Sequence, residues 1–578
     1  MVQPPEVSGG GGFTFEDAPV AIYLGALLGE ESAPGLNGRI VMRVAVQQAA
    51  YGEPLDDLIV DGRGADGSIS RLSLQTKREL TISSATTNTD FREIITRAWA
   101  TLQKPNFRES VDRVGAVVGT VSDTARRAFV TICDWARASE SLETFLDHFK
   151  PGQSDDDKRN ALKSVRDILG DDSGTTGGAK AYRLLRHFVL IRFDVLHEGA
   201  TDDTHAIERL RHHLHEPGRA SDLWQRLLRL AREAAGRAQE FSRLSLLSHL
   251  RGTVRLAGVQ SLRLDLERVM EETQNALDSI ACEIDGVKIP RPAVVVSVRQ
   301  AVEKSRFVTI VGLPGTGKSA ILHACVQDDL RNGTVLLLKS DRFTGPNWSA
   351  HARSLGIGAP TIESLLSEIS ATGSSVLYVD GIDRIAVGQR GVVVDLLNAI
   401  HRSTLLSQWK VVVTCRDNGI EPLRTWLPPT IFAGGGGVAT VEVEPFNDAE
   451  AEQLAAEKPV LRPLLFGDDR VREIARRPFF AAVLVRSMDG TIGQAAPQSE
   501  VELLNVWWAR GGLRIGRTAP LSKAARPHST REGRGRGFGA AHPIGRNRPH
   551  SNCRSAPRQH HQGCYARAYR PVRARHLL

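Results

Sequence analysis

The sequence predicts a multidomain α/β protein, and three observations support this expectation. The chain has 578 residues, which suggests about three or four domains at roughly 150 residues each. Hydrophobic residues at 41% and charged residues at 24% are ordinary values for a folded protein and exclude a wholly disordered or collagen-like chain. Between residues 307 and 443, short apolar runs alternate with helical patterns. This alternation is typical of a parallel sheet covered by helices on both faces.

The N-terminal region predicts a compact α/β unit over residues 13–130, preceded by a flexible Gly/Pro-rich leader at residues 1–12. Apolar spacing and β-rich runs set its elements. We expect helices at 16–28 and 91–102, and strands at 39–46, 57–60 and 68–77, the last two joined by a Gly-rich turn.

Helical patterns dominate the next stretch, so residues 131–288 are expected to form a helical connector. Strands are then expected at 307–311, 335–338, 376–379 and 411–414, with helical patterns between them. This strand-helix alternation predicts an α/β domain at residues 289–445. Helical patterns at 448–457 and 471–486 predict a small lid subdomain within residues 446–512.

The last segment, residues 513–578, breaks every pattern and is expected to be disordered. It carries a net charge of +14, so the remaining 512 residues sum to −6 within the total of +8. The basicity therefore belongs to this tail and not to the body of the chain. Two interpretations stay open: a basic arm for nucleic acid, or an out-of-frame reading of a GC-rich gene that leaves the chain truncated.

Sequence features also bear on location. The apolar runs fall short of the roughly 20 residues that a membrane helix needs, and no secretion signal opens the chain. The six cysteines are scattered without paired spacing, as in reduced intracellular proteins. We therefore expect a cytoplasmic protein without a membrane partner.

A phosphate-binding motif provides the strongest functional signal. Residues 312–319 read Gly-Leu-Pro-Gly-Thr-Gly-Lys-Ser and match the pattern G-x-x-x-x-G-K-[ST] between an apolar strand and a helix. Backbone N–H groups of such a loop surround phosphate oxygens, Lys318 neutralises the β- and γ-phosphates, and the Ser319 hydroxyl ligates Mg²⁺. The expected nucleotide-binding residues of this loop are Gly312, Pro314, Gly315, Thr316, Gly317, Lys318 and Ser319.

Two later strands end in residues suited to the same site. Asp380 ends the run 376–380 and is expected to hold Mg²⁺ through water, while Asp383 is the candidate to polarise the attacking water. Arg416 follows the strand at 411–414 and could sense the γ-phosphate.

These segments resemble the STAND class of P-loop ATPases, the NACHT-like signalling switches. The resemblance runs from about residue 289 to 508 and includes the Pro445-Phe446 and Arg477-Pro478 stretches, which are similar to lid motifs. It implies an ATP-gated switch that forms a homo-oligomer on activation, normally with a C-terminal sensor that this sequence lacks. Many relatives carry a catalytic glutamate after the magnesium aspartate, whereas this chain has Gly381, so hydrolysis is expected to be slow.

A second group of residues predicts metal-assisted phosphodiester hydrolysis near the N-terminus. Strand alternation places Ser73, Gln75 and Lys77 on one face, opposite Leu72, Leu74 and Thr76. Asp57 lies on the neighbouring strand. Asp57 and the Gln75 carbonyl oxygen are expected to bind Mg²⁺, while Lys77 orients or activates water.

This group resembles the Q-x-K variant of the PD-(D/E)xK nuclease superfamily, particularly the effector nucleases of bacterial antiviral proteins. The resemblance covers about residues 13–130 and implies a restriction-endonuclease-like fold with a DNA substrate. Glu16 matches the helix-borne acid of that superfamily, whereas Gln75 replaces the usual acid and should hold metal less firmly.

The sequence thus predicts an ATP-binding switch that controls a metal-dependent DNA endonuclease in antiphage defence, released by an unidentified trigger such as a phage protein. An alternative is an ATP-binding regulator or scaffold whose nuclease-like domain is inactive; Gln75 favours this alternative, while Asp57 and Lys77 oppose it. An ATP-driven DNA translocase ranks below both, because further helicase motifs are absent from the sequence.

Overall fold

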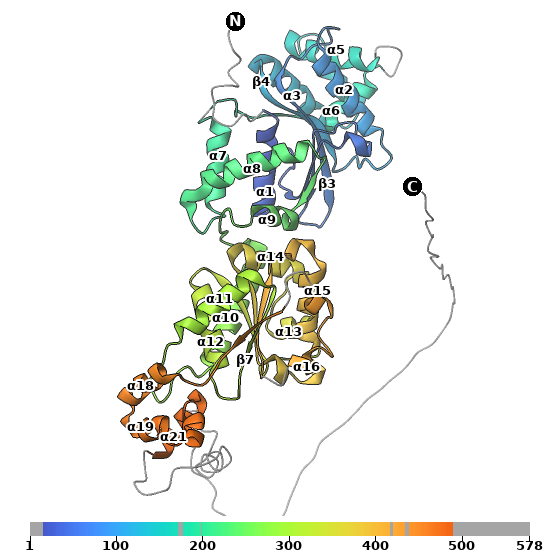
Figure 1. The fold of residues 1–578 in the computed structure, drawn as a ribbon. Helices are drawn as coiled ribbons and strands as arrows, with labels where there is room; N and C mark the ends of the chain where they lie inside the picture. Colours follow the sequence, from blue (N-terminus) through green and yellow to red (C-terminus); the bar gives the residue numbers. More distant parts are fainter. Residues whose placement is uncertain (1–14, 172–176, 198, 417–419, 434–437, 489–578) are drawn as a thin grey trace, which may run out of the picture. The chain divides into compact units, whose positions relative to one another are not determined.

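The computed structural model describes residues 15–171, 177–197, 199–416, 420–433 and 438–488, which build two sheets with their helices and a small helical group (Figure 1). The predicted leader at 1–12, the tail at 513–578 and the end of the expected lid lie outside these residues. No helix of the described chain is long and apolar enough to cross a membrane.

The N-terminal sheet has six strands in the order β5-β4-β3-β2-β1-β6. Strands β1 to β3 pair antiparallel, whereas β3, β4 and β5 pair parallel. The antiparallel pair β2–β3 turns at the Gly-rich segment expected from the sequence. The bounds are β1 Ile40–Val46, β2 Leu58–Arg63, β3 Ile69–Leu80, β4 Arg113–Val121, β5 Phe188–Arg192 and β6 Glu240–Ser242.

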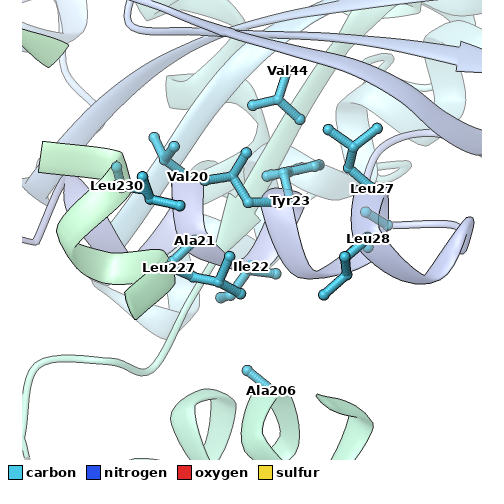
Figure 2. Close-up of a cluster of buried hydrophobic side chains, with 14 of the residues drawn as sticks. Val20, Ala21, Ile22, Tyr23, Leu27, Leu28, Val44, Ala206, Leu227 and Leu230 are labelled. Carbon is cyan, nitrogen blue, oxygen red and sulfur yellow. The ribbon is translucent and has the colours of Figure 1, made fainter. Parts of the chain in front are cut away.

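One face of this sheet is covered by a long apolar helix and three later helices. These are α1 (Asp17–Gly29), α7 (Thr201–Arg211), α8 (Ala220–Ala235) and α9 (Arg243–Leu250). Helix α1 is buried along nearly its whole length because it lies between the sheet and α8. Figure 2 shows Val20 and Tyr23 of α1 among side chains from β1, α7 and α8.

The opposite face carries a second apolar core. Helices α2 (Thr89–Leu102), α3 (Asp123–Ala138), α5 (Asp156–Leu169) and α6 (Ala179–His187) pack against β4 and β5 there. The short helix α4 (Leu142–Asp147) adds Phe145 to the same core. Most of the stretch expected as a connector therefore packs on the N-terminal sheet, since its amphipathic helices bury their apolar stripes against the two sheet faces.

The second sheet has five parallel strands in the order β11-β7-β10-β9-β8. Helices lie on both of its faces, as the alternating pattern predicts (Figure 1). The strands are β7 Phe307–Val311, β8 Thr334–Lys339, β9 Gly373–Asp380, β10 Lys410–Thr414 and β11 Val438–Glu442; the helices are α10 Arg263–Asp278, α11 Pro292–Lys304, α12 Lys318–Leu330, α13 Trp348–Ser354, α14 Ile362–Thr372, α15 Gly391–Arg402, α16 Ile420–Leu423 and α17 Thr430–Ala433.

A small helical group follows the second sheet and forms its own core, which we call the lid. It comprises α18 (Asp448–Glu457), α19 (Arg462–Phe466), α20 (Asp469–Ala475) and α21 (Pro478–Met488). The helix expected at 471–486 is two helices, because Pro478 begins a new one at its first helical position. Ile284, upstream of the second sheet, also packs into the lid core.

Candidate functional site

The predicted phosphate loop, Gly312–Ser319, connects β7 to α12, as the motif requires. All seven nucleotide-binding residues expected from the sequence lie on this one turn. The Lys318 ammonium donates hydrogen bonds to the carbonyl oxygens of Gly312, at 2.7 Å, and Leu313, at 2.8 Å. The lysine therefore lies folded back over its own loop.

Two glycines of the loop are required by its backbone. Gly312 has φ 147°, and a Cβ there would come within 2.4 Å of the Val443 carbonyl oxygen. Gly317 has φ 94° and caps the N-terminus of α12. Side chains are disfavoured at both positions, so the loop can leave its N–H groups open at a helix N-terminus.

Asp380 at the end of β9 lies beside the loop, and its Oδ1 atom accepts hydrogen bonds from two hydroxyls. Ser319 Oγ donates at 2.7 Å and Thr414 Oγ1, at the end of β10, also at 2.7 Å. Asp380 is 1% exposed; its Oδ2 atom accepts no hydrogen bond and lies 3.7 Å from the Arg384 guanidinium. A buried carboxylate oxygen next to a serine hydroxyl is a suitable donor set for Mg²⁺, which takes oxygen ligands.

Asp383 and Arg416 form an ion pair at the same edge of the sheet. Arg416 Nε donates to Asp383 Oδ2 at 2.5 Å, and this bond together with the charge of Asp383 raises the pKa of Arg416. Gly381 between the two aspartates has φ 71°, and its N–H donates to Thr414 Oγ1. The expected water-polarising acid and the expected phosphate sensor thus neutralise each other in this state.

The lid touches the phosphate loop directly. The Phe479 backbone N–H donates to the Gly315 carbonyl oxygen at 3.1 Å. Arg291, whose side chain is 8% exposed, donates to the Thr316 carbonyl oxygen at 3.3 Å and to Glu450 of α18 at 2.9 Å. Neither Arg291 nor Thr414 was expected at this site from the sequence. A threonine ending the strand beside Asp380 could have indicated the second, but no local signal marks the first.

The N-terminal candidate residues meet where β2 begins and β3 passes. Asp57 Oδ2 accepts hydrogen bonds from Gln75 Nε2 and, at 2.8 Å, from the Thr76 backbone N–H. Gln47 Nε2 donates to the other oxygen, Oδ1, at 3.2 Å. Asp57, Gln75 and Lys77 are together called the candidate nuclease site below.

Burial raises the pKa of Asp57 to about 6, and the negative charges of Asp56 and Glu16 add to this effect. The Thr76 N–H bond and the charge of Lys77 act in the opposite direction but do not outweigh it. Glu16 stands at the N-cap of α1 and is exposed, and it acts on Asp57 through its charge. A cation would relieve this concentration of negative charge.

Lys77 is held by two acids on α2. Its Nζ atom lies 2.9 Å from Asp90 and 3.4 Å from Glu93. Burial alone would lower the pKa of Lys77, but the hydrogen bonds and charges of these acids outweigh it and raise the pKa. The ammonium is therefore protonated at neutral pH and suits charge stabilisation better than proton removal.

Arg97 on α2 contacts Gln75 of the candidate nuclease site and two nearby acids, and it was not expected from the sequence. It donates to Asp56 at 2.6 Å, pairs with Glu93 at 2.6 Å and lies 3.5 Å from Gln75 Oε1. The amide of Gln75 therefore directs its N–H toward Asp57 and its oxygen toward Arg97. Residue spacing could not reveal Arg97, because it lies 41 positions from Asp56.

The candidate nuclease site offers Mg²⁺ only a few protein ligands. Within the described part of the chain, no group of three or more His, Cys, Asp or Glu residues is arranged to hold a metal ion. Asp57 and the Gln75 amide oxygen, once turned from Arg97, provide two oxygen ligands. Mg²⁺ commonly binds through one or two protein oxygens and completes its shell with water and substrate phosphates.

Comparisons with known proteins concern mainly the second sheet. Residues 308–425 match the family model of the ATPase family associated with various cellular activities (AAA). This span contains the phosphate loop, Asp380, Asp383 and Arg416, so the chain carries an AAA-type ATPase domain of the P-loop class. No curated protein matches the chain.

Solved structures overlap the chain with low scores. The Cap4 SAVED/CARF-domain containing receptor of Moraxella osloensis has a TM-score of 0.26, 12% identity and 69% coverage of each chain. The Acinetobacter baumannii Cap4 receptor with the cyclic trinucleotide 2'3'3'-cAAA has a TM-score of 0.26 and 13% identity, covering 64% of this chain and 62% of that chain. The Walker-type ATPase of Pyrococcus abyssi has a TM-score of 0.26 and 14% identity, covering 41% and 77%. At these scores the overlaps carry no argument about function.

Proposed function

We propose that this protein is an ATP-binding switch that controls a metal-dependent DNA endonuclease, as in bacterial antiphage defence. The observation that carries the nuclease part is the contact of Gln75 with Asp57 beside Lys77 on one strand face. The Q-x-K resemblance assigns these three residues to one site, with the amide oxygen of Gln75, which here faces Arg97, as the metal ligand. The antiviral role, the homo-oligomer and the phage-derived trigger rest on that resemblance and on the resemblance to STAND switches.

In the proposed nuclease reaction, each residue has one task. Asp57 and Gln75 would hold Mg²⁺, which neutralises phosphate charge and makes bound water a better nucleophile. Lys77, protonated and placed by Asp90 and Glu93, stabilises the charge that develops on the phosphate. Glu16 adds negative charge that favours cation binding. The raised pKa of Asp57 means that acid pH would weaken the metal site.

In the proposed switch, the phosphate loop binds ATP and the lid responds. Ser319 and Asp380 would hold Mg²⁺; the Oδ2 atom of Asp380 accepts no hydrogen bond and lies 3.7 Å from Arg384 Nη2, so the ion's water shell would share it with that guanidinium. Lys318 would leave the carbonyl oxygens of Gly312 and Leu313 for the phosphates. Asp383 is paired with Arg416, so water activation requires this pair to open, which agrees with the slow hydrolysis expected from Gly381.

A second candidate function is an ATP-binding regulator whose nuclease-like fold only binds a partner. The orientation of Gln75 favours it, because the amide N–H faces Asp57 while the oxygen faces Arg97. Metal binding would have to reorganise these contacts for cleavage to occur.

Cleavage of plasmid and linear DNA by the full chain tests the proposal, with Mg²⁺ or EDTA and with or without ATP. Lys77→Ala should abolish cleavage, whereas Lys163→Ala, an exposed lysine on α5, should not change it. Lys318→Ala should abolish ATP binding and the ATP dependence of cleavage, with the exposed Lys304→Ala as control. ATP binding by a chain that never cleaves DNA would favour the regulator.

A further inference from the structure

A basic cleft of about 310 Å³ lies on the same strand face as the candidate nuclease site. Four cations and two acids line it, together with Ser73, Thr101, Asn106 and Phe107; the charged residues are Arg71, Lys104, Arg108, Arg113, Glu53 and Asp112. The lining therefore has an excess of two positive charges. The function described above uses none of these side chains.

The cleft is continuous with the candidate nuclease site along β3. Arg71, Ser73, Gln75 and Lys77 alternate along the strand and so point to one side of it. At about 3.4 Å per residue, Arg71 lies roughly 14 Å from Gln75 along the strand. This is about four steps of one strand of B-DNA, in which phosphates follow each other every 3.4 Å along the axis.

Helix α2 forms the second wall and runs antiparallel to β3. Glu93 pairs with Lys77, Arg97 reaches Gln75, and Thr101 lines the cleft with Ser73. These residues of α2 are spaced by four, which gives about 12 Å over the three at 1.5 Å per residue. The two walls therefore stay in register from the candidate nuclease site to the cleft.

The acids in the cleft each accept bonds from more than one donor, so a phosphate could draw a cation away without leaving either acid unpaired. Asp112 accepts the backbone N–H groups of Arg71 and Arg108, each at 2.8 Å, besides the Arg108 guanidinium. Glu53 is shared by Arg71 at 3.2 Å and Lys104 at 2.7 Å. Arg108 and Lys104 each have side-chain exposure, of 46% and 25%.

Arginines that do not line the cleft add to the positive electrostatic potential around it. Burial lowers the pKa of Arg113, and the charges of Arg137, Arg39 and Arg186 lower it further, against the single opposing acid Asp112. An anion entering the cleft would relieve this repulsion. Closely spaced arginines and a lysine are the side chains that bind phosphate groups in proteins.

We propose that the cleft lined by Lys104, Arg108 and Arg113 binds backbone phosphates of the DNA strand about four nucleotides from the bond that the candidate nuclease site cuts. This inference rests on the proposed nuclease function. It assigns to the cleft the positioning of the substrate, while Asp57, Gln75 and Lys77 carry out the chemistry. Phosphate contacts set register and affinity without reading sequence, so the cleft imposes no base preference.

The test measures binding of a fluorescein-labelled 20-bp duplex to the full chain by anisotropy, in EDTA so that no cleavage occurs, over a series of salt concentrations. The double variant Lys104→Gln/Arg108→Gln should bind more weakly, and the slope of log Kobs against log[salt] should fall in magnitude by about 2, or one per lost phosphate contact. Asp112 keeps two backbone donors and Glu53 keeps Arg71, so neither acid is stranded in this variant.

The matched control is Lys158→Gln/Arg219→Gln, which removes the same charges outside the cleft. Lys158 is 21% exposed and Arg219 is 46% exposed, and both are ion-paired like their counterparts. This control should keep the wild-type affinity and slope. The variant Lys104→Arg/Arg108→Lys retains both charges and should also keep the wild-type slope, which separates a charge effect from misfolding.

The results of this test separate the proposal of phosphate binding in the cleft from the proposal of DNA cleavage. Equal affinity and slope for wild type and Lys104→Gln/Arg108→Gln would overturn the proposal that the cleft binds phosphates, even if wild type cleaves DNA in Mg²⁺. A wild-type chain that does not bind the duplex would overturn it as well. Loss of binding in this variant, in a protein that never cleaves DNA, would support the cleft and refute only the proposed cleavage.

Discussion

The raised pKa of Asp57 makes the stability of the N-terminal sheet depend on pH in a way that one substitution should remove. Asp57 has a pKa of about 6 in the folded chain, against an ordinary value of 3.8 that the unfolded chain is expected to have. The folded state therefore binds more protons than the unfolded state between these values. Stability should fall as pH rises through this window, because ionisation of Asp57 is disfavoured only in the folded state.

The magnitude follows from the size of the shift. A difference of about 2 pKa units corresponds to about 3 kcal/mol, fully expressed above pH 6 and absent well below pH 4. Asparagine at position 57 cannot ionise, so Asp57→Asn should not lose this stability as pH rises. Between pH 4.5 and pH 7.5, the difference in unfolding free energy between Asp57→Asn and wild type should therefore shift by about 2 kcal/mol in favour of the variant. At pH 4.5 Asp57 of the folded chain is mostly protonated and as neutral as asparagine, so wild type and Asp57→Asn should differ less in stability than at pH 7.5.

Pulse proteolysis in urea provides the assay, with mass spectrometry of peptides from β2 and β3 so that only the N-terminal sheet is followed. Asp156→Asn serves as control because Asp156 is 88% exposed. The control should follow wild type at both pH values. At pH 7.5, Mg²⁺ should stabilise wild type by about 2.7 kcal/mol at 100 times its Kd but leave Asp57→Asn unchanged. Parallel pH dependence of wild type and Asp57→Asn would refute the reasoning.

Three further predictions concern the second sheet and its neighbours. Asp380→Ala should retain ATP binding in EDTA but lose the enhancement by Mg²⁺, measured by titration calorimetry; an unchanged Mg²⁺ effect would exclude Asp380 from the metal site. Glu368→Ala should cost about 3 kcal/mol in urea unfolding, because it strands Arg243 and the Val259 N–H; Glu271→Ala, at an exposed pair, should cost less than about 1 kcal/mol, and equal costs would contradict this reasoning. Arg291→Ala should expose the lid to protease, since it removes the bonds to Thr316 and Glu450; an unaltered digestion pattern would show that the lid packs without them.

Local pattern was sufficient to predict four of the five strands of the second sheet, whereas β11 was not expected. The bounds expected for β7, residues 307–311, are those observed, and the helix expected at 448–457 is α18. Both are short elements with strong signals at their ends: β7 precedes the glycine of the phosphate loop, and α18 begins with a capping box between Asn447 and Glu450. The match of motif and strand also explains why the phosphate loop was predicted residue by residue.

Contacts between segments far apart in the chain could not be predicted from the local sequence pattern. β5, with five residues, lies inside a stretch of helical periodicity and pairs with β4 more than 60 positions earlier. An amphipathic helix shows the same period whether it covers a sheet or links two domains, so α3, α5 and α8 gave no sign of their sheet contacts. For the same reason the sequence indicated Gln75 and Lys77 but not Arg97, Asp90 or Glu93, which fix them from α2.

The contacts of the phosphate loop explain why binding of ATP, more than its hydrolysis, is suited to act as a signal. Phosphate binding draws on the N–H groups of the loop and on Lys318, whose ammonium must leave two loop carbonyls. Two neighbouring carbonyls, those of Gly315 and Thr316, hold the lid through Phe479 and Arg291. A change in the loop therefore displaces both attachment points of the lid at once. Hydrolysis needs the further opening of the Asp383–Arg416 pair, so we expect the lid to respond to occupancy well before turnover.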